Sequence, residues 1–120
     1  MAVYSHERYN TLVEQTVKNL KELASIKGGE YAGDQDRLAN FRRNAENLGL
    51  LQEQVWAVYA GKHYDAIAQY IKDLGKNISR HRMESISGRA DDLIVYLTLF
   101  KAMVDEREMG LGTVIPIAHY

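Results

Sequence analysis

The segment from Lys27 to Phe41 combines residue types that bind charged ligands. It holds three glycines and three acids, and four basic residues accompany them. Glycine lets the backbone turn sharply and approach a ligand closely, and Mg²⁺ takes one or two carboxylates together with phosphate oxygens. The pattern predicts a loop that holds a charged, phosphorylated small molecule. The acids are Glu30, Asp34 and Asp36, and the bases are Lys27, Arg37, Arg42 and Arg43.

Two of these acids also have a structural interpretation. Asp34 or Asp36 stands where the next helix is expected to begin. A carboxylate there accepts hydrogen bonds from the first N–H groups of the helix and complements the helix dipole. Capping and contact with a ligand or a metal ion both remain open for these side chains.

A second candidate group has the spacing of one helical stripe. Arg89, Asp92 and Tyr96 are three and four residues apart and therefore share a face of a helix. Leu93 and Ile94 draw Asp92 toward the interior, where a carboxylate needs a partner. That partner is either Arg89, in an ion pair that only fixes the helix register, or a lysine or a metal ion.

Lys62 and His63 form the third candidate, directly after Gly61. A helical segment that starts there could receive a phosphate, because helix N-termini attract anions. The alternative is a histidine that is simply packed. The four histidines have no paired spacing that would indicate a metal site: His6, His63, His81 and His119.

A basic run precedes Glu84 and has two interpretations. It is either a solvated surface or a gate for an anionic ligand, and it lacks the interleaved aromatic residues that single-stranded nucleic acid would need. No Ser-His-Asp pattern, phosphate-binding loop motif or dinucleotide fingerprint accompanies it. The run consists of Lys72, Lys76, Arg80, His81 and Arg82.

Composition restricts the class of protein. The 120 residues suffice for one domain, and the net charge of −1 gives no overall attraction to nucleic acid or to an anionic membrane. The absence of cysteine excludes disulfides and thiolate zinc sites. No apolar stretch reaches the roughly 20 residues that span a bilayer. We therefore expect a cytoplasmic protein without membrane partners, for which nucleic acid is not the expected ligand.

The elements that must position these residues are predicted to be helices. Apolar residues recur every three to four positions, and the one proline, Pro116, lies near the C-terminus. Ser5 is expected to cap the first helix, Gly28 and Gly29 to end it, and Gly49 to end the second. An all-α bundle of about four helices follows, with a helical domain over 1–109 and a tail over 110–120. The predicted helices cover about 6–25, 38–48, 55–74 and 84–106.

Two details of the later helices are less regular. Gly61 is expected to kink or split the third helix, since glycine costs about 1 kcal/mol relative to alanine there. The fourth helix is predicted to bury a single apolar face. That face consists of Ile86, Ala90, Leu93, Ile94, Leu97, the stem of Lys101, and Val104.

The short motifs follow one another in a definite order: Lys27…Glu30-Tyr31…Asp36…Asn40-Phe41, then Lys62-His63, then Arg89-Ala-Asp-Asp92…Tyr96. In this order they resemble the small phage and prophage proteins called nucleotide modification associated domain 1. Those proteins show a Lys…Asp-Tyr loop followed by Asn-Phe, a later Lys-His pair and an Arg-x-x-Asp-Leu-x-x-Tyr helix. The match covers about residues 20–105.

The resemblance implies a phage or prophage origin, a role in nucleotide metabolism inside the host cell, and a distant similarity to all-α nucleoside triphosphate pyrophosphatases of the MazG and dUTPase type. Those enzymes bind magnesium through Glu-x-x-Glu and Glu-x-x-Asp on helix faces. This chain has no clear Glu-x-x-Glu: its first helix offers Glu14 and Glu22, eight residues apart, and its fourth offers Asp91 and Asp92.

Three functions follow as hypotheses. The favoured one is a nucleotide-binding protein that sequesters a nucleotide signal of host immunity, and it requires no metal. The second is a Mg²⁺-dependent pyrophosphohydrolase, with Asp36 and Asp92 as metal ligands. The third is a structural helical module, and apolar stripes on every helix predict a homo-oligomer. The predicted nucleotide-binding residues are Lys27, Tyr31, Arg37, Asn40, Lys62, His63, Arg89 and Tyr96, and stacking on the base is expected from Tyr31, Tyr64, Tyr70, Tyr96 or Trp56.

Overall fold

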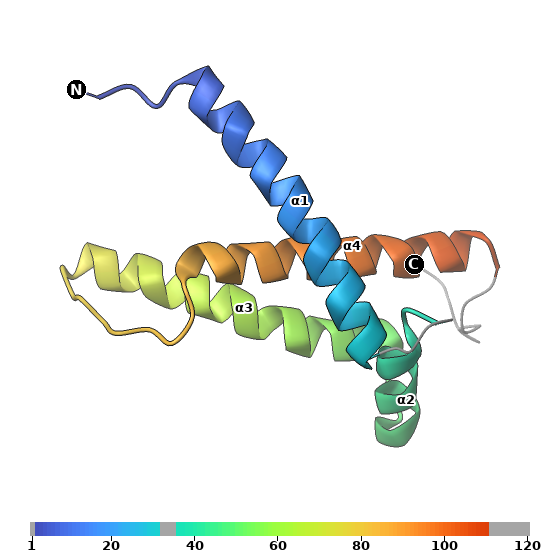
Figure 1. The fold of residues 1–120 in the computed structure, drawn as a ribbon. Helices are drawn as coiled ribbons and strands as arrows, with labels where there is room; N and C mark the ends of the chain where they lie inside the picture. The colour runs from blue at the N-terminus through green and yellow to red at the C-terminus, as the bar shows by residue number, and fades with distance from the viewer. Residues whose placement is uncertain (1, 32–35, 111–120) are drawn as a thin grey trace.

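The computed structural model describes residues 2–31 and 36–110, without the side chains of residues 24 and 26–31. Four helices and no strand are found in these ranges, which confirms the all-α prediction (Figure 1). None of these helices combines the length and apolarity that crossing a bilayer requires. The helices are α1 over His6–Tyr31, α2 over Ala39–Leu48, α3 over Gln52–Gly75 and α4 over Ile86–Glu108.

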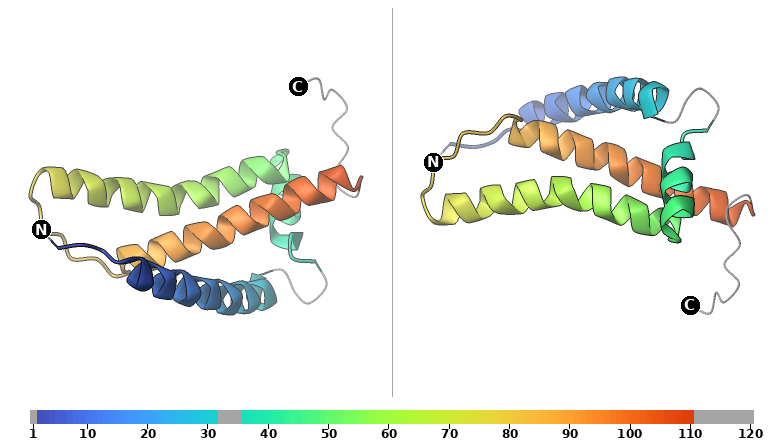
Figure 2. Two further views of the ribbon diagram at one scale, coloured as in Figure 1. Left: turned by 90° about the horizontal axis from the view of Figure 1, so that it is seen from above. Right: turned by 90° about the horizontal axis from the view of Figure 1, so that it is seen from below.

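The helix α4 lies in the middle of the arrangement. It packs lengthwise against α3 on one side, and α1 crosses it on the other (Figure 2). The short α2 packs across the N-terminal part of α3, far from the loop that joins α3 to α4 (Figure 1). Because α4 contacts helices on two sides, it has two partly covered faces and not one.

The buried core belongs to α2, α3 and α4. Phe41 is 5% exposed, and its ring meets those of Tyr59 and Tyr96 edge to face, at centroid distances of 6.2 and 6.3 Å. Such aromatic pairs add about 0.5–1.5 kcal/mol to the stabilisation that burial gives. No described side chain of α1 belongs to this cluster. Its buried members are Leu38, Phe41, Ala45, Val55 and Met103.

Several helix ends follow the predicted local rules. The Ser5 hydroxyl accepts a hydrogen bond from the Arg8 N–H (3.1 Å), as expected for a cap of α1. Gly49 adopts a left-handed conformation (φ 67°) and ends α2. Ser85 caps α4 through a bond from the Gly88 N–H (2.9 Å).

The predicted end of the first helix is wrong, because α1 continues through Gly28 and Gly29 to Tyr31. A glycine ends a helix by turning left-handed, as Gly49 does, whereas Gly28 and Gly29 lie within the helix. Each costs about 1 kcal/mol relative to alanine, which a long helix tolerates. Much of the predicted ligand loop is therefore helical.

The third and fourth helices also differ from expectation. Gly61 does not interrupt α3, which is continuous from Gln52 to Gly75. On α4, Leu97 and Val104 of the predicted buried face are 49% and 40% exposed. The most buried side chains are instead Val95 and Met103, and Tyr96, Leu99 and Ala102 pack beside the core. The prediction of one buried apolar face is wrong because α4 packs between two other helices, α1 and α3.

The loop between α3 and α4 is fastened to α3 by a buried carboxylate. Asp73 is 2% exposed and accepts bonds from Arg80 (2.8 Å), Arg82 (2.7 Å) and Gln69 (3.0 Å). The Arg82 guanidinium also lies 5.1 Å from the centre of the Tyr70 ring. These two arginines of the predicted basic run are thus engaged in holding the loop.

Candidate functional site

Four of the predicted site residues meet where α3 faces the N-terminal half of α4. His63 of α3 lies with its Nδ1 3.7 Å from Asp92 Oδ2 and 3.4 Å from Arg89 Nη1. Its ring is 5.2 Å from that of Tyr96. Arg89, Asp92 and Tyr96 face His63 together because their spacing places them on one stripe of α4.

The His63 Nδ1 atom cannot satisfy both of its polar neighbours at once. Arginine only donates hydrogen bonds, so a contact with Arg89 requires an unprotonated Nδ1, whereas a contact with the Asp92 carboxylate requires a proton on it. Side-chain exposures of 13% for His63 and 15% for Asp92 keep the pair away from most solvent. The two contacts therefore require different protonation of the same ring atom.

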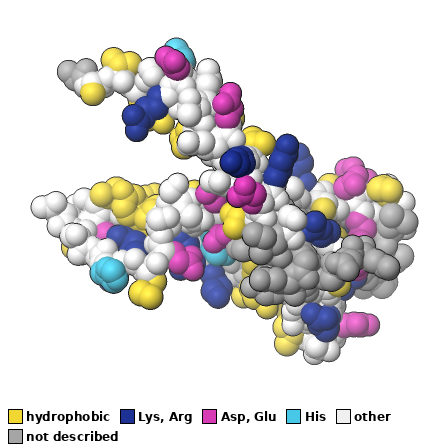
Figure 3. Space-filling model, in the orientation of Figure 1, with side chains coloured by type: hydrophobic (Ala, Val, Ile, Leu, Met, Phe, Trp, Pro, Cys, Tyr) yellow, Lys and Arg dark blue, Asp and Glu magenta, His cyan; other side chains and the backbone are white. Residues whose placement is uncertain are grey.

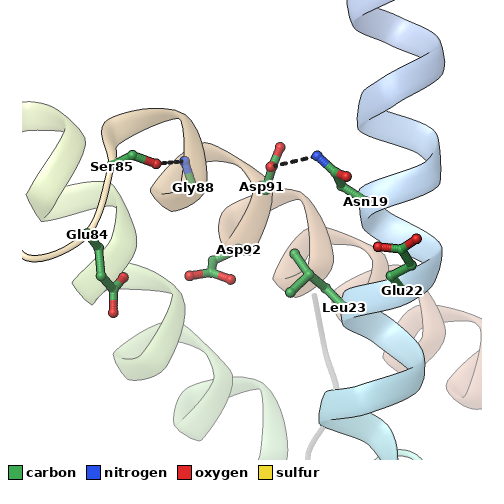
Figure 4. A pocket seen from close by; sticks show the side chains of 8 residues that line it. All are labelled: Asn19, Glu22, Leu23, Glu84, Ser85, Gly88, Asp91 and Asp92. Carbon is green, nitrogen blue, oxygen red and sulfur yellow. Dashed lines mark hydrogen bonds between the residues drawn. The ribbon is translucent and has the colours of Figure 1, made fainter.

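A groove of about 460 Å³ adjoins this cluster, between α1 and the start of α4 (Figure 4). Asp92 belongs to both the groove and the cluster. Figure 4 shows Asp91 directed toward Asn19 of α1, whose amide donates to it (3.4 Å). The residues that line the groove are Asn19, Glu22, Leu23, Glu84, Ser85, Gly88, Asp91 and Asp92.

Gly88 is needed for the shape of this groove. A Cβ atom at this position would lie 2.9 Å from the Ser85 hydroxyl oxygen that caps α4. Real side chains essentially never come so close, so a larger residue would displace the cap. The glycine thus lets the helix start tightly at the wall of the groove.

The lining is strongly acidic. It holds four carboxylates and, among the described residues that form it, no basic side chain. Arg89, which directly follows Gly88 of the lining, is paired with Glu84 (3.3 Å). A phosphate entering the groove would meet unfavourable charge unless a cation accompanied it. The four acids are Glu22, Glu84, Asp91 and Asp92.

Carboxylate oxygens suit Mg²⁺, but they are not gathered into a ready cage. Within residues 2–31 and 36–110, no three or more His, Asp or Glu side chains are arranged to hold a metal ion. Mg²⁺ commonly binds through one or two carboxylates and completes its shell with water and phosphate oxygens. In that mode, Asp92 and one other acid of the lining would be the protein ligands.

The other predicted metal ligand lies elsewhere. Asp36 accepts bonds from Arg42 (2.9 and 3.0 Å) and from the Leu38 N–H (2.9 Å), and Arg42 also bonds to Glu106. Glu106 is fourteen residues beyond Asp92 on α4, or about 21 Å at 1.5 Å per residue. Asp36 is therefore at the opposite end of the bundle and does not share a site with Asp92 within one chain.

Opposite charges keep the side chains of Asp36, Arg42 and Glu106 paired. The Arg42 guanidinium lowers the pKa of Asp36 and, with Gln52, the pKa of Glu106. Glu106 and Asp36 in turn raise the pKa of Arg42. Asp36 is not the N-cap of α2, because that position is held by Leu38 without a side-chain cap; the Asp36 carboxylate accepts a bond from the Leu38 N–H just before the helix begins.

The remaining predicted residues are not all observable. Lys62 is exposed on α3, beside His63, and Arg37 is exposed before α2. Asn40 lies partly buried on α2, at the end of the bundle away from the groove. The side chains of Lys27, Glu30, Tyr31 and Asp34 are outside the described part of the chain.

The groove contains residues that the sequence analysis did not select. Asn19 and Glu22 are three residues apart on α1, and Glu84 directly precedes the Ser85 cap. The three-residue spacing of Asn19 and Glu22 indicates, from the sequence alone, that both side chains lie on one face of a helix. No local signal indicates that this face crosses the start of α4, because that depends on tertiary packing.

The comparisons with known proteins give no assignment. No protein-family model, no curated protein and no solved structure matches the chain.

Proposed function

We propose that this chain binds and holds a nucleotide in the groove between α1 and α4, with a divalent cation between the carboxylates and the phosphates. The observation that carries the proposal is the position of Asp92. It lines the groove and also lies 3.7 Å from His63, which contacts Arg89, so this carboxylate joins the groove to an imidazole and a guanidinium that do not line the groove themselves. The sequence resemblance to nucleotide modification associated domain 1 supports the ligand class.

The cation would supply the positive charge that the acidic lining lacks. Asp92 and either Glu84 or Asp91 would hold it, since all three residues line the groove, although Figure 4 shows Asp91 turned toward Asn19 and Asp92 turned away from it. The preferred nucleotide is accordingly one with adjacent phosphates, which can complete the shell of the cation. A nucleotide that is held and not cut is sequestered, so the chain would act as a sponge for a nucleotide signal.

Two basic residues that lie outside the lining of the groove, Arg89 and Lys62, would contact the phosphates. Arg89 offers a planar set of donors that matches a phosphate, provided that it leaves Glu84. Lys62 is exposed next to His63 on α3. Ligand binding thus replaces the Arg89–Glu84 ion pair by an Arg89–phosphate pair.

Stacking on the base is limited by the packing of the aromatic rings. Tyr96 is occupied by Phe41 and His63, and Trp56 packs at 4.9 Å against Phe100. Among the described rings considered for stacking, Tyr64 is the most accessible, at 61% exposure. Most of the affinity is therefore expected from the phosphates.

A second candidate is a Mg²⁺-dependent pyrophosphohydrolase. The observation in its favour is that acids of two helices, Glu22 of α1 and Asp91 and Asp92 of α4, line one groove. His63, beside Asp92, is placed to accept a proton from an attacking water. The site of this enzyme would be the same groove. The alternative without any ligand is a purely structural helical module.

A nucleotide panel with and without Mg²⁺ distinguishes these functions. Cyclic dinucleotides, ADP-ribose derivatives and nucleoside triphosphates are incubated with the chain, and the products are separated after heat denaturation. Recovery of intact, Mg²⁺-dependently bound ligand supports sequestration. Release of monophosphate and pyrophosphate supports hydrolysis. The absence of binding by any member of the panel overturns both.

Asp92→Asn is the sharpest variant for this test. Removing the charge that joins the groove to the cluster should weaken Mg²⁺-dependent nucleotide binding at least about tenfold, or about 1.4 kcal/mol. Asp105→Asn is the matched control, because Asp105 is an exposed aspartate of the same helix. Calorimetric titration measures both. Equal affinity of the two variants would place the ligand elsewhere.

A further inference from the structure

The N-terminal half of α1 carries an apolar face that is exposed. Tyr9, Leu12, Val13 and Val17 share this face by their spacing. Their exposures are 53%, 45%, 43% and 45%. The same face continues into Leu23, which lines the groove at α4 and is only partly exposed. The face is therefore covered at one end and open at the other.

The opposite face of this half-helix is charged. At 100° per residue, Glu7, Glu14, Lys18 and Lys21 all project away from the apolar face. A helix with such a division buries its apolar face against another element. Nothing in the described part of the chain does so: the core contains no side chain of α1, and Figure 3 shows this half of α1 standing clear of the body.

The described part of the chain also has an excess of exposed apolar side chains. Among the residues that the structure describes, seven hydrophobic ones are buried, whereas eighteen large ones are 36% exposed or more. Single exposed hydrophobic residues are ordinary, but a contiguous apolar face indicates an interaction surface. The α1 face is a contiguous case of this kind.

The total surface is larger than one folded chain of this mass requires. The chain exposes 9393 Å². The fifteen residues outside the described ranges would contribute about 2,400 Å² even at the full exposure of an unfolded chain, and about 6,000 Å² is expected for the remaining mass of about 12 kDa. The surplus of about 1,000 Å² is close to the roughly 800 Å² that each partner buries in a standard interface.

We infer that a second copy of this chain covers this surplus, with the two α1 helices packed antiparallel around Val13. Such an interface is isologous: each copy presents the same apolar face and receives the same face. Tyr9 and Leu12 of one copy would lie against Val17 and Val13 of the other. The helices would meet through a neutral apolar seam, with the charged faces directed to solvent.

The composition of α1 argues against a membrane as the occupant. Helices that lie on anionic membranes are rich in Lys and Arg on the polar face. From His6 to Ser25, α1 has three acids and three bases, which gives no net attraction. The acids are Glu7, Glu14 and Glu22, and the bases are Arg8, Lys18 and Lys21.

Dimerisation would also steady the groove. Asn19, Glu22 and Leu23 form its α1 wall, one to three turns beyond Val13 on the same helix. Within one chain, the Asn19 amide donates a hydrogen bond of 3.4 Å to Asp91, and this bond connects the α1 wall to α4. The inference does not depend on which ligand the groove binds.

The absence of cysteine allows a direct test by cross-linking. Val13→Cys and Lys18→Cys each introduce the sole thiol of the full chain, on opposite faces of α1. A short bis-maleimide should convert most of the Val13→Cys protein into a covalent dimer and much less of the Lys18→Cys protein. Equal cross-linking of the two variants would overturn the antiparallel seam.

Light scattering after size exclusion gives the second measurement. The unmodified chain should elute as a dimer, and Val13→Glu should raise the dimer dissociation constant at least about tenfold, because it buries a charge in the seam. Val13 is exposed within one chain, so far-ultraviolet circular dichroism should show unchanged helicity. Val58→Glu, at a 66% exposed site of α3, is the control. A monomer at every concentration, or an intact Val13→Glu dimer, contradicts the inference.

Discussion

An arginine–carboxylate cluster stabilises each end of the bundle, and each cluster is built around one central side chain. Asp73 receives Arg80 and Arg82 at the loop between α3 and α4. Arg42 bridges Asp36 and Glu106 at the other end. Breaking a buried pair by removing one partner is costly, because the other charge remains without compensation. These residues therefore serve the architecture, and the candidate site lies between them.

Asp73 should make the stability of the chain depend on pH in acid. Hydrogen bonds from Arg80 and then Gln69 lower its pKa from 3.8 to about 2. A carboxylate whose pKa falls on folding stabilises the folded state above the unfolded pKa, and this contribution is lost as the pH falls through the folded value. We expect the melting temperature to fall between about pH 4 and pH 2 for this reason.

Asp73→Asn isolates this contribution. The variant should melt at a lower temperature than the unmodified chain at pH 7, and the difference should narrow toward pH 2. Thermal denaturation followed by circular dichroism at several pH values measures both curves. Parallel curves for the two proteins would show that Asp73 is not the responsible group.

At this scale, the sequence was informative where contacts are local. The stripe of Arg89, Asp92 and Tyr96 could be predicted because three- and four-residue spacings define a helix face. The separation of Asp36 from Asp92 could not, because it depends on α2 docking at the far end of α3. Residue spacing contains no information about that placement.

At the scale of the helices, α2 depends on one aromatic anchor. Phe41 is 5% exposed and touches Tyr59 of α3 and Tyr96 of α4. Phe41→Ala should lower the free energy of unfolding by about 3–5 kcal/mol, through lost burial and a cavity. Leu48→Ala, at a 67% exposed position of the same helix, should change it by no more than about 0.5 kcal/mol. Urea denaturation compares them, and similar losses would contradict the docking role.

Two glycines of opposite conformation provide a second prediction for the helices. Gly61 lies in mid-helix, and a Cβ atom there would meet no atom within 4 Å. Gly61→Ala should therefore stabilise the chain by about 0.5–1 kcal/mol. Gly49→Ala also meets no atom, but its φ of 67° is left-handed and should cost about 1–2 kcal/mol.

Thermal melts of the two alanine variants measure this contrast. Opposite shifts of the melting temperature are expected, and shifts of the same sign would contradict the assignment of Gly49 as a helix stop. The same contrast explains the error at Gly28 and Gly29. A glycine residue permits a left-handed stop but does not require one, so the residue type alone could not distinguish a helix end from a helix interior.

Helix existence was predictable along the whole described chain, whereas burial on α4 was not. Apolar periodicity predicts a helix but assumes one buried face. Because α4 packs against both α1 and α3, its apolar residues are spread around the helix, and Leu97 and Val104 remain partly exposed. The groove escaped prediction for the same reason, since it exists only where α1 crosses α4.

At the scale of the whole molecule, the inferred dimer should make stability depend on concentration. Association stabilises the folded state by mass action, so the melting temperature of the unmodified chain should rise as its concentration increases. The melting temperature of Val13→Glu should depend less on concentration than that of the unmodified chain, because its dimer is weaker. Calorimetric scans over an about hundredfold range of protein concentration measure this dependence of the melting temperature. A flat curve for the unmodified chain would contradict dimerisation.

Trp56 gives the molecule an internal optical probe. It is the only tryptophan of the chain, and its indole N–H donates a hydrogen bond to the backbone carbonyl of Tyr96 (2.6 Å). The Tyr96 ring in turn lies against His63 of the candidate site. Intrinsic fluorescence therefore reports, without any label, on the packing of α3 against α4 beside the His63 cluster.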